Sequence, residues 1–381
     1  MGALWRTGIG SWCVAASALG IGWWPAAASA TGVRLEPVAQ GLQNPWAMAS
    51  IGEGRWLVTE RPGRMRVVEP DGRLGEPLAG VPAVAAVGQG GLLDVITDRD
   101  FPRNRRVHFC YAEPGAGGNS TAMASAVLAP DRRSLQDLRV VFRQTPKVDS
   151  RLHFGCRIVQ AGDGSLFLTL GDRYHRMQDA QTLDNHHGKV VRVRPDGAAH
   201  VDNPFARPSG PPSGALPEIY SLGHRNPQGA ALGPDGALWL VEHGPQGGDE
   251  VNRIVAGRNY GWPVITYGEN YGGGAIGEGI TARAGLEQPL KHWTPSIAPS
   301  GMVWLRSDRY GPSWQNSLFV GSLKFRYLSR LVFEQGRFVR EERLLPEIGA
   351  RVRDVREGPD GLLYLLTDDA NGRLLRVVPG A

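Results

Sequence analysis

The chain has 381 residues, which is enough for one large domain or two ordinary ones. Its net charge of +5 is spread along the sequence without a basic stripe, which argues against nucleic-acid binding. Glycine (52 residues) and proline (28 residues) are abundant while helical periodicity is scarce, and this combination indicates many short strands joined by turns.

Residues 1–30 have the pattern of a secretory signal peptide. Arg6 gives a positive start, Trp12 to Trp24 is a short apolar run, and Ala28-Ser29-Ala30 supplies the small residues of a cleavage site. Neither this run nor any later stretch is long and apolar enough to span a bilayer. We therefore expect cleavage after Ala30, a periplasmic or secreted protein, and one catalytic domain over residues 31–381.

One turn recurs along the chain and indicates the architecture. An Asp-Gly pair, which supplies the positive φ of a tight turn, begins at Asp71, Asp163, Asp196, Asp235 and Asp360. Three of these pairs continue as Asp-Gly-x-Leu-(Phe/Trp/Tyr)-Leu and reach an acid within four residues. The spacing fits multiples of about 60 residues, the size of a four-stranded propeller blade with its loops. We predict an all-β, six-bladed β-propeller, with a pair of β-sandwiches as the alternative.

Three candidate polar residues lie in the first half of the chain. Gln89 stands between glycines, where its amide can approach a flat ligand. His153 precedes a strand, and Asp172 follows one. Histidine suits proton transfer near neutral pH, and a nearby acid would orient it. A purely structural role is the alternative for each of the three.

The pair His186-His187 also attracts attention as a possible metal site. Adjacent side chains on a strand point to opposite faces, so we interpret this pair as a structural turn that enters a strand.

The densest polar stretch is Ser221 to Glu250. Arg225 and Asn226 lie in a turn, and a short apolar strand after them ends in a loop of carbonyls and carboxylates that includes Asp249. Calcium accepts such oxygen ligands. The alternative is a hairpin with solvated ends.

The last third of the chain adds cations. Lys324 follows a predicted strand, and Arg351 and Arg353 share one face of another strand. Two guanidiniums this close repel each other unless an anion lies between them. Together with Arg225 they make four cations, which a polycarboxylate ligand would satisfy.

An ordered series of motifs resembles the glucose/sorbosone dehydrogenase family, in particular its soluble aldose sugar dehydrogenases. The motifs are GQGGLLD, HFGCR, GDR, GHRNPQG, EHGPQGGDE, NYGWP, PSIAPSG, GSLK and RVRDV, and they run through nearly the whole mature chain. The family folds as a six-bladed propeller and uses pyrroloquinoline quinone (PQQ) with calcium. The resemblance implies an enzyme that oxidises aldose sugars at C1 to the lactone by hydride transfer to PQQ. An external electron acceptor, such as a cytochrome, quinone or dye, would reoxidise the reduced PQQ.

The resemblance also implies residue roles. The catalytic group would be His153 as general base, Asp172 as its orienting acid and Arg225 as the cation that stabilises charge on the reduced cofactor. Further cofactor contacts would come from Gln89, Asn226, Tyr271, Ser322, Lys324, Arg351 and Arg353. The carbonyls of Gly244 and Pro245 would hold the catalytic calcium, and Glu250 and Tyr260 would hold a second, structural one.

Two positions depart from the family pattern. Leu152 replaces an acid of the glucose-type enzymes, which favours the aldose branch, and Cys156 replaces a usual glycine. Cys156 and Cys110 are able to pair in an oxidising compartment, but nothing in the sequence places them close together.

Two rival functions remain open at this point. A calcium-dependent propeller hydrolase or lactonase would need carboxylate and amide side chains around a central ion, whereas this sequence offers cations and carbonyls. A non-catalytic binding propeller would be indicated by loss of His153, Arg225 or the Arg351 and Arg353 pair, and all four residues are present.

Overall fold

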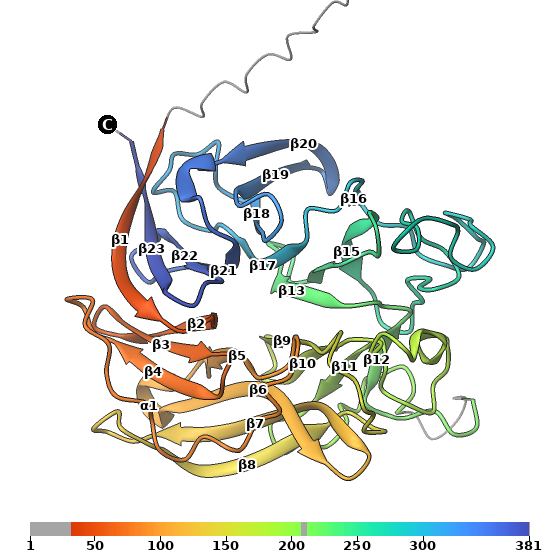
Figure 1. Cartoon of the computed structure of the whole chain (residues 1–381), viewed down its shortest axis with the longest axis horizontal. Coiled ribbons are helices and arrows are strands. Elements are labelled where there is room, and N and C mark those ends of the chain that lie inside the picture. Colours follow the sequence, from red (N-terminus) through yellow and green to blue (C-terminus); the bar gives the residue numbers. More distant parts are fainter. Residues whose placement is uncertain (1–31, 207–211, 381) are drawn as a thin grey trace, which may run out of the picture.

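The computed structural model describes residues 32–206 and 212–380, so the expected signal peptide lies outside the described residues. Six antiparallel sheets are arranged around a central axis as the blades of a propeller (Figure 1). The predicted fold class is confirmed. None of the helices in the described ranges is long and apolar enough to cross a bilayer.

The two ends of the chain close the ring. One sheet has the order β1 (Val33–Leu42), β23 (Gly372–Pro379), β22 (Leu363–Thr367) and β21 (Val352–Glu357), so the first described strand pairs with the last (Figure 1). This antiparallel pairing removes the open edge that the sheet of β21 to β23 would otherwise present.

The other five sheets follow one another along the chain. They are, in order, β2 (Pro45–Gly52), β3 (Arg55–Glu60) and β4 (Arg64–Val68); β5 (Leu92–Thr97), β6 (Arg106–Gly115), β7 (Gly118–Leu128) and β8 (Leu135–Arg143); β9 (Gly155–Gln160), β10 (Leu166–Leu170), β11 (Lys189–Val193) and β12 (Ile219–Leu222); β13 (Pro227–Leu232), β14 (Leu238–Glu242), β15 (Asp249–Ile254) and β16 (Lys291–Trp293); and β17 (Pro299–Trp304), β18 (Leu318–Ser322), β19 (Leu328–Glu334) and β20 (Arg337–Leu344). Short helices are α1 (Phe101–Asn104), η1 (Met177–Gln181) and η2 (Pro346–Ile348).

The innermost strands are β2, β5, β9, β13, β17 and β21, and each contacts the innermost strands of the neighbouring blades. The three long repeats form the hairpin between the first and second strands of their blades. Gly164, Gly236 and Gly361 have φ of 86°, 76° and 77° there, as the Asp-Gly turns require. Each second strand then returns toward the end of the propeller where its first strand began, and brings its terminal acid to that end.

A network of charged side chains fills the middle of the ring. Arg157 Nη1 lies 3.1 Å from Asp94 Oδ1 and 2.9 Å from Asp354 Oδ1. Arg356 pairs with the same two carboxylates at 2.6 and 2.9 Å. Two positive and two negative charges from β5, β9 and β21 therefore balance one another inside the core.

Cys110 of β6 and Cys156 of β9 form a disulfide that joins neighbouring blades. Cys156 has φ of 78°, a conformation that glycine adopts without steric cost. This backbone geometry accounts for glycine at the same place in the family.

The histidine pair is structural, as predicted. His186 faces Thr145, and its Nδ1 lies 3.1 Å from the Thr145 backbone nitrogen. His187 Nδ1 lies 2.8 Å from Asp179 Oδ2.

Candidate active site

His153 and Asp172 form a buried pair at the end of the propeller where the innermost strands begin. The loop before β9 carries His153, and Asp172 follows β10, the strand that pairs with β9. The distance between His153 Nδ1 and Asp172 Oδ1 is 2.6 Å. Trp262 Nε1 donates to the other carboxylate oxygen at 2.7 Å, and the Tyr174 amide donates to Oδ1 at 2.8 Å. Asp172 is thus fixed from three sides and holds the imidazole.

Glycine allows the two segments to approach this closely. A Cβ on Gly171 would lie 2.0 Å from the backbone oxygen of His153, so only glycine fits between the end of β10 and the histidine loop. His153 itself has φ of 50°, and its amide donates to Gln89 Oε1 at 2.8 Å. Gln89 therefore supports the backbone of the predicted base, a role that its glycine-flanked position alone did not reveal.

Burial and charge keep this imidazole neutral. Burial is the largest influence and lowers the pKa of His153; the Asp172 carboxylate raises it, and the Arg225 guanidinium lowers it again. The pKa of Asp172 is lowered despite its burial, because the His153 hydrogen bond favours the carboxylate. With Nδ1–H donated to Asp172, Nε2 carries the lone pair, and it has no hydrogen bond to any described residue. With a free lone pair at Nε2, an imidazole held in this way is able to accept a proton.

Arg225 lies beside this pair at the start of β13. Arg225 is buried, with 4% of the residue exposed. Its Nη1 donates to the carbonyls of His243 at 3.2 Å and Gly244 at 2.7 Å. The guanidinium lies 5.2 Å from the centre of the Trp262 ring. Its Nε has no hydrogen-bond partner among the described residues. A fixed cation with a free donor thus stands next to the base.

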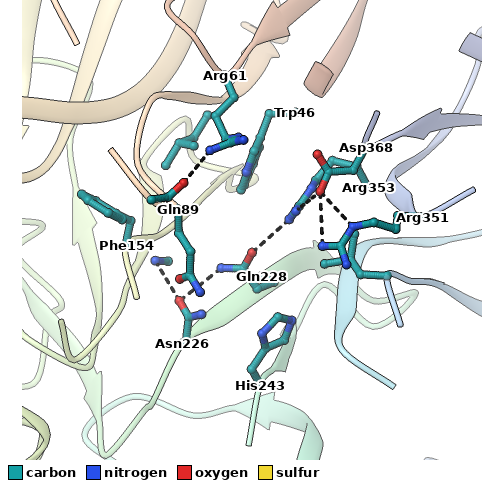
Figure 2. A pocket seen from close by; sticks show the side chains of 14 residues that line it. Trp46, Arg61, Gln89, Phe154, Asn226, Gln228, His243, Arg351, Arg353 and Asp368 are labelled. Atoms are coloured by element: carbon teal, nitrogen blue, oxygen red, sulfur yellow. Dashed lines mark hydrogen bonds and ion pairs between the residues drawn. The ribbon is translucent and has the colours of Figure 1, made fainter. Parts of the chain in front are cut away.

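A cavity of about 200 Å³ lies at this end of the propeller, and Figure 2 shows the residues that line it. Four predicted cofactor contacts line it, namely Gln89, Asn226, Arg351 and Arg353. Further lining residues, which the sequence did not single out, are Trp46, Arg61, Gly88, Leu93, Phe154, Gly155, Gln228, His243, Leu323 and Asp368. Phe154 and Gly155 directly follow His153 in the chain, and Asn226 follows Arg225, but His153 and Arg225 are not themselves among the residues that line this cavity.

The anion expected between Arg351 and Arg353 is in part supplied by the protein. Asp368 Oδ2 lies 3.3 Å from Arg351 Nε and 2.7 Å from Arg353 Nη2 (Figure 2). The pKa of Asp368 is lowered although the group is buried, since Arg353 and Arg351 favour its carboxylate. Asp368 therefore serves both guanidiniums within the protein itself, and the binding of a ligand carboxylate to them stays a prediction. Arg353 Nε still lacks a partner among the described residues.

A second hollow of about 650 Å³ adjoins the first and shares Leu323 and Arg351 with it. The predicted contacts Tyr271 and Lys324 line this hollow, together with Pro245. Tyr271 is 64% exposed, so it lies at the rim. The predicted contacts are thus divided between two adjoining spaces that share Arg351.

Ser322, like Arg225, is a predicted cofactor contact that lines neither space. It is fully buried, donates to the Ile297 carbonyl at 2.9 Å and accepts from the Phe325 amide at 3.0 Å. The structure therefore uses its hydroxyl to fix the loop that carries Lys324.

The four predicted metal ligands form two groups. Gly244 O accepts a hydrogen bond from Arg225, and Pro245 lines the second hollow. Glu250 accepts from Asn252 Nδ2 at 3.0 Å, while the Tyr260 hydroxyl bonds only to backbone groups of Arg253 and Val255. Burial and the neighbouring Glu242 carboxylate raise the pKa of Glu250 to about 8. In residues 32–206 and 212–380, three or more His, Cys, Asp or Glu side chains do not gather as a metal cluster anywhere.

Asp249 serves a structural role that the sequence did not reveal. Its carboxylate accepts from the amides of Gly244, Ile297 and Ala298 at 2.7 to 2.9 Å and from the Ser296 hydroxyl. It therefore holds the carbonyl loop of Gly244 against the segment before β17 and is not available as a metal ligand. Even so, burial raises the pKa of Asp249 to about 6.

The long Asp-Gly repeat would have identified two acids at this end of the propeller, Glu242 and Asp368, that were not predicted as site residues. Asp172, Glu242 and Asp368 are the acids that follow the three long Asp-Gly repeats, and all three lie at this end of the propeller. Glu242 accepts from the Arg225 amide at 2.7 Å and from His224 at 3.0 Å. The repeat thus marks three blades whose second strand delivers an acid to this end of the propeller, whereas β3 ends in an acid, Glu60, without the repeat.

Known proteins resemble this chain in sequence and in fold. A model of the Glucose / Sorbosone dehydrogenase family matches residues 42–376. The aldose sugar dehydrogenase YliI of Escherichia coli (strain K12) is 45% identical over 349 residues, 91% of this chain and 92% of that protein. The crystal structure of the soluble aldose sugar dehydrogenase from Escherichia coli in the apo-form has a TM-score of 0.87 and 43% identity, and covers 91% of this chain and 99% of that one.

A structure of the PQQ-bound form of an aldose sugar dehydrogenase from Streptomyces coelicolor is also similar. Its TM-score is 0.71 at 27% identity, and the match covers 92% of this chain and all (100%) of that one. The resemblance inferred from the ordered motifs is confirmed. The chain belongs to the glucose/sorbosone dehydrogenase family.

Proposed function

We propose that the protein oxidises aldose sugars at C1 to the lactone, with PQQ as the hydride acceptor and His153 as the general base. The observation that carries this proposal is the buried His153–Asp172 pair beside a cavity lined by cations. A base that removes the hydroxyl proton and a site for an anionic acceptor are the two parts that such a reaction needs.

The residues of the cavity fit the cofactor. PQQ is a flat tricarboxylate, and Arg61, Arg351 and Arg353 face the cavity with only Asp368 as a lining carboxylate. The buried Nε atoms of Arg225 and Arg353 have no partner among the described residues and are free to donate to an anionic ligand. Trp46 adds a flat apolar wall. The cofactor carboxylates would therefore be held by Arg351, Arg353, Lys324 and Arg61, and the ring system by Asn226 and Gln89.

The chain's own groups have distinct tasks in the reaction. His153 Nε2 takes the proton of the C1 hydroxyl, and Asp172 stabilises the imidazolium that results. Arg225 places positive charge where negative charge develops on the acceptor. When bound, PQQ supplies the two-electron acceptor for the hydride that leaves C1. The substrate carbon then carries a carbonyl, and the ring product is a lactone.

Calcium fits the site in donor chemistry, with one condition. Backbone carbonyls such as Gly244 O and Pro245 O are ligands that calcium accepts, and the ion would act as a Lewis acid at the acceptor. The condition is that Gly244 O would serve both the ion and Arg225 Nη1, which the two lone pairs of a carbonyl oxygen allow. For the second, structural calcium we propose Glu250 and the backbone of Tyr260, because the Tyr260 hydroxyl is already bonded.

The test is reconstitution of the purified apo-protein with PQQ and calcium, followed by dye reduction with a panel of aldoses. We expect turnover that needs both additions. Cofactor binding without turnover on any aldose would contradict the proposed reaction and favour a non-catalytic binding propeller. Absence of binding, with turnover on a lactone panel, would favour the hydrolase.

We propose that the signal peptide directs the protein to the periplasm or the medium, where Cys110 and Cys156 would be oxidised. N-terminal sequencing of the mature protein from a fractionated culture tests this, with Thr31 as the expected first residue. An external acceptor would then reoxidise the cofactor.

A further inference from the structure

Arg173 follows the orienting acid of the base and has an environment unlike that of an ordinary buried arginine. It is the largest of the fully buried side chains and has no carboxylate within ion-pair distance in the described ranges. Its Nε and Nη1 have no hydrogen-bond partner among the described residues. Burial lowers the pKa of Arg173 to about 9, so the guanidinium stays charged at neutral pH. A buried charge without an ion-pair partner costs several kcal/mol, and the Asp172 carboxylate offsets only part of the effect of burial on Arg173. Retention of this arginine therefore calls for a functional explanation.

Most contacts of the Arg173 side chain are with the loop that carries His153, and one is with Asn119 of β7. Its guanidinium lies 3.6 Å from the centre of the Phe154 ring, and Phe154 is the residue after His153. Nη2 donates to the Ser150 carbonyl at 2.8 Å and to Asn119 Oδ1. The Ser150 hydroxyl donates back to the Arg173 carbonyl at 2.8 Å. Arg173 therefore holds this loop on both sides of His153, at Ser150 before it and at Phe154 after it.

The backbone geometry shows why this loop needs such contacts. His153, Arg173 and Tyr174 have φ of 50°, 62° and 67°, which non-glycine residues rarely adopt. Conformations of this kind persist only when surrounding contacts hold them.

We propose that Arg173 is a positioning residue, whose guanidinium holds the loop of His153 in place and supplies a positive charge, without an ion-pair partner, near the imidazole. The proposal rests on the assignment of His153 as base in the proposed function. Other charged or titratable groups near the imidazole are Asp172 and Tyr174 on the same loop as Arg173, and Arg225 and His243 from the next blade. Asp172 favours the protonated imidazole, while Arg225 and Arg173 oppose it. The charge of Arg173 thus helps to keep the base neutral despite its acid partner.

The decisive variant is Asn119→Asp, which places a carboxylate on the atom that Arg173 already contacts. It leaves every side chain of the catalytic group in place and neutralises the buried cation. We expect the pKa of His153, followed by NMR on the apo-protein, to rise by about half a unit or more. The acid limb of kcat/KM should rise in parallel.

Arg173→Met and Arg173→Lys separate the effect of the charge from that of the guanidinium contacts with Phe154 and Ser150. The methionine variant should raise the pKa of His153 and also lower kcat about tenfold or more, with KM changed less. The lysine variant should keep the pKa near the wild-type value but still lower kcat. Arg330→Met is the matched control, since Arg330 is also buried and stacked on an aromatic ring, Trp314, but is paired with Glu342.

The pKa measurement needs neither sugar nor cofactor, so it remains valid if the proposed reaction is wrong. An unchanged His153 pKa in Asn119→Asp would overturn the electrostatic role, whether or not Arg173→Met folds. An unchanged kcat in Arg173→Lys would overturn the positioning role of these contacts.

Discussion

Two sets of buried arginines in this propeller have opposite electrostatic environments. In the middle of the ring, Arg157 and Arg356 share Asp94 and Asp354, and the charges cancel. At the site end, Arg225 is bonded to carbonyls, Arg353 shares one carboxylate with Arg351, and Arg173 has none. All three have an Nε without a partner among the described residues.

The two sets of arginines differ in their partners: the central charges pair with one another, whereas each site-end arginine keeps a donor without a partner among the described residues. The balanced network joins innermost strands, since Asp94 also accepts from the Ile158 amide and Asp354 from the Met48 amide. Of the site-end cations, Arg353 lines the cavity, whereas Arg225 and Arg173 lie near His153 and lower its pKa. We infer that the first set serves stability and the second serves function, and the following variants test this division.

The largest effect is expected for His153→Ala. Loss of a positioned general base costs about 10²- to 10⁴-fold in rate. PQQ affinity should change little. The free energy of unfolding should fall by about 1–3 kcal/mol, because the buried Asp172 carboxylate loses a hydrogen-bond partner. Steady-state kinetics beside a PQQ titration measure the rate and the affinity, and retained turnover would remove His153 from the mechanism.

The next largest effect is expected for Arg157→Met, and it should appear in stability. Removing one member of a buried ionic network costs about 3–5 kcal/mol, because Asp94 and Asp354 keep their charge without it. Urea unfolding measures this loss. A loss below about 1 kcal/mol would show that the central network does not hold the blades together.

The double variant Arg351→Ala with Arg353→Ala should weaken PQQ binding about tenfold or more, since charge-assisted hydrogen bonds to the carboxylates are lost. Stability should fall much less than in Arg157→Met. Arg376→Ala, which removes a partly exposed surface pair with Glu36, is the matched control. Unchanged PQQ affinity in the double variant would remove both arginines from the binding site.

The smallest expected effect is a displaced pH profile. Burial lowers the pKa of His153 below its ordinary value of about 6.5, so the neutral base persists in mildly acidic solution. The acid limb of kcat/KM should therefore lie below pH 6.5. A limb at or above that value would mean that Asp172 outweighs burial and the nearby arginines.

The sequence predicted the fold and most of the site for identifiable physical reasons. Asp-Gly turns with positive φ recur in equivalent hairpins, so they revealed the blades, and the ordered motifs placed His153 and Asp172 together. The sequence did not reveal Asp368 between Arg351 and Arg353, the Trp262 bond to Asp172, or the pairing of Cys110 with Cys156. Each of these contacts joins segments whose approach is set by how the blades meet, which no local pattern encodes.

The most direct test of the division between the two sets is the thermal unfolding of the metal-free apo-protein with increasing PQQ, with and without calcium. Binding to the folded state raises Tm with ligand concentration. We predict that wild type and the stability-impaired Arg157→Met variant both gain Tm on PQQ addition, while the Arg351→Ala, Arg353→Ala protein gains little. A wild-type Tm that does not respond to PQQ would contradict the claim that the site-end cations are built for an anionic cofactor.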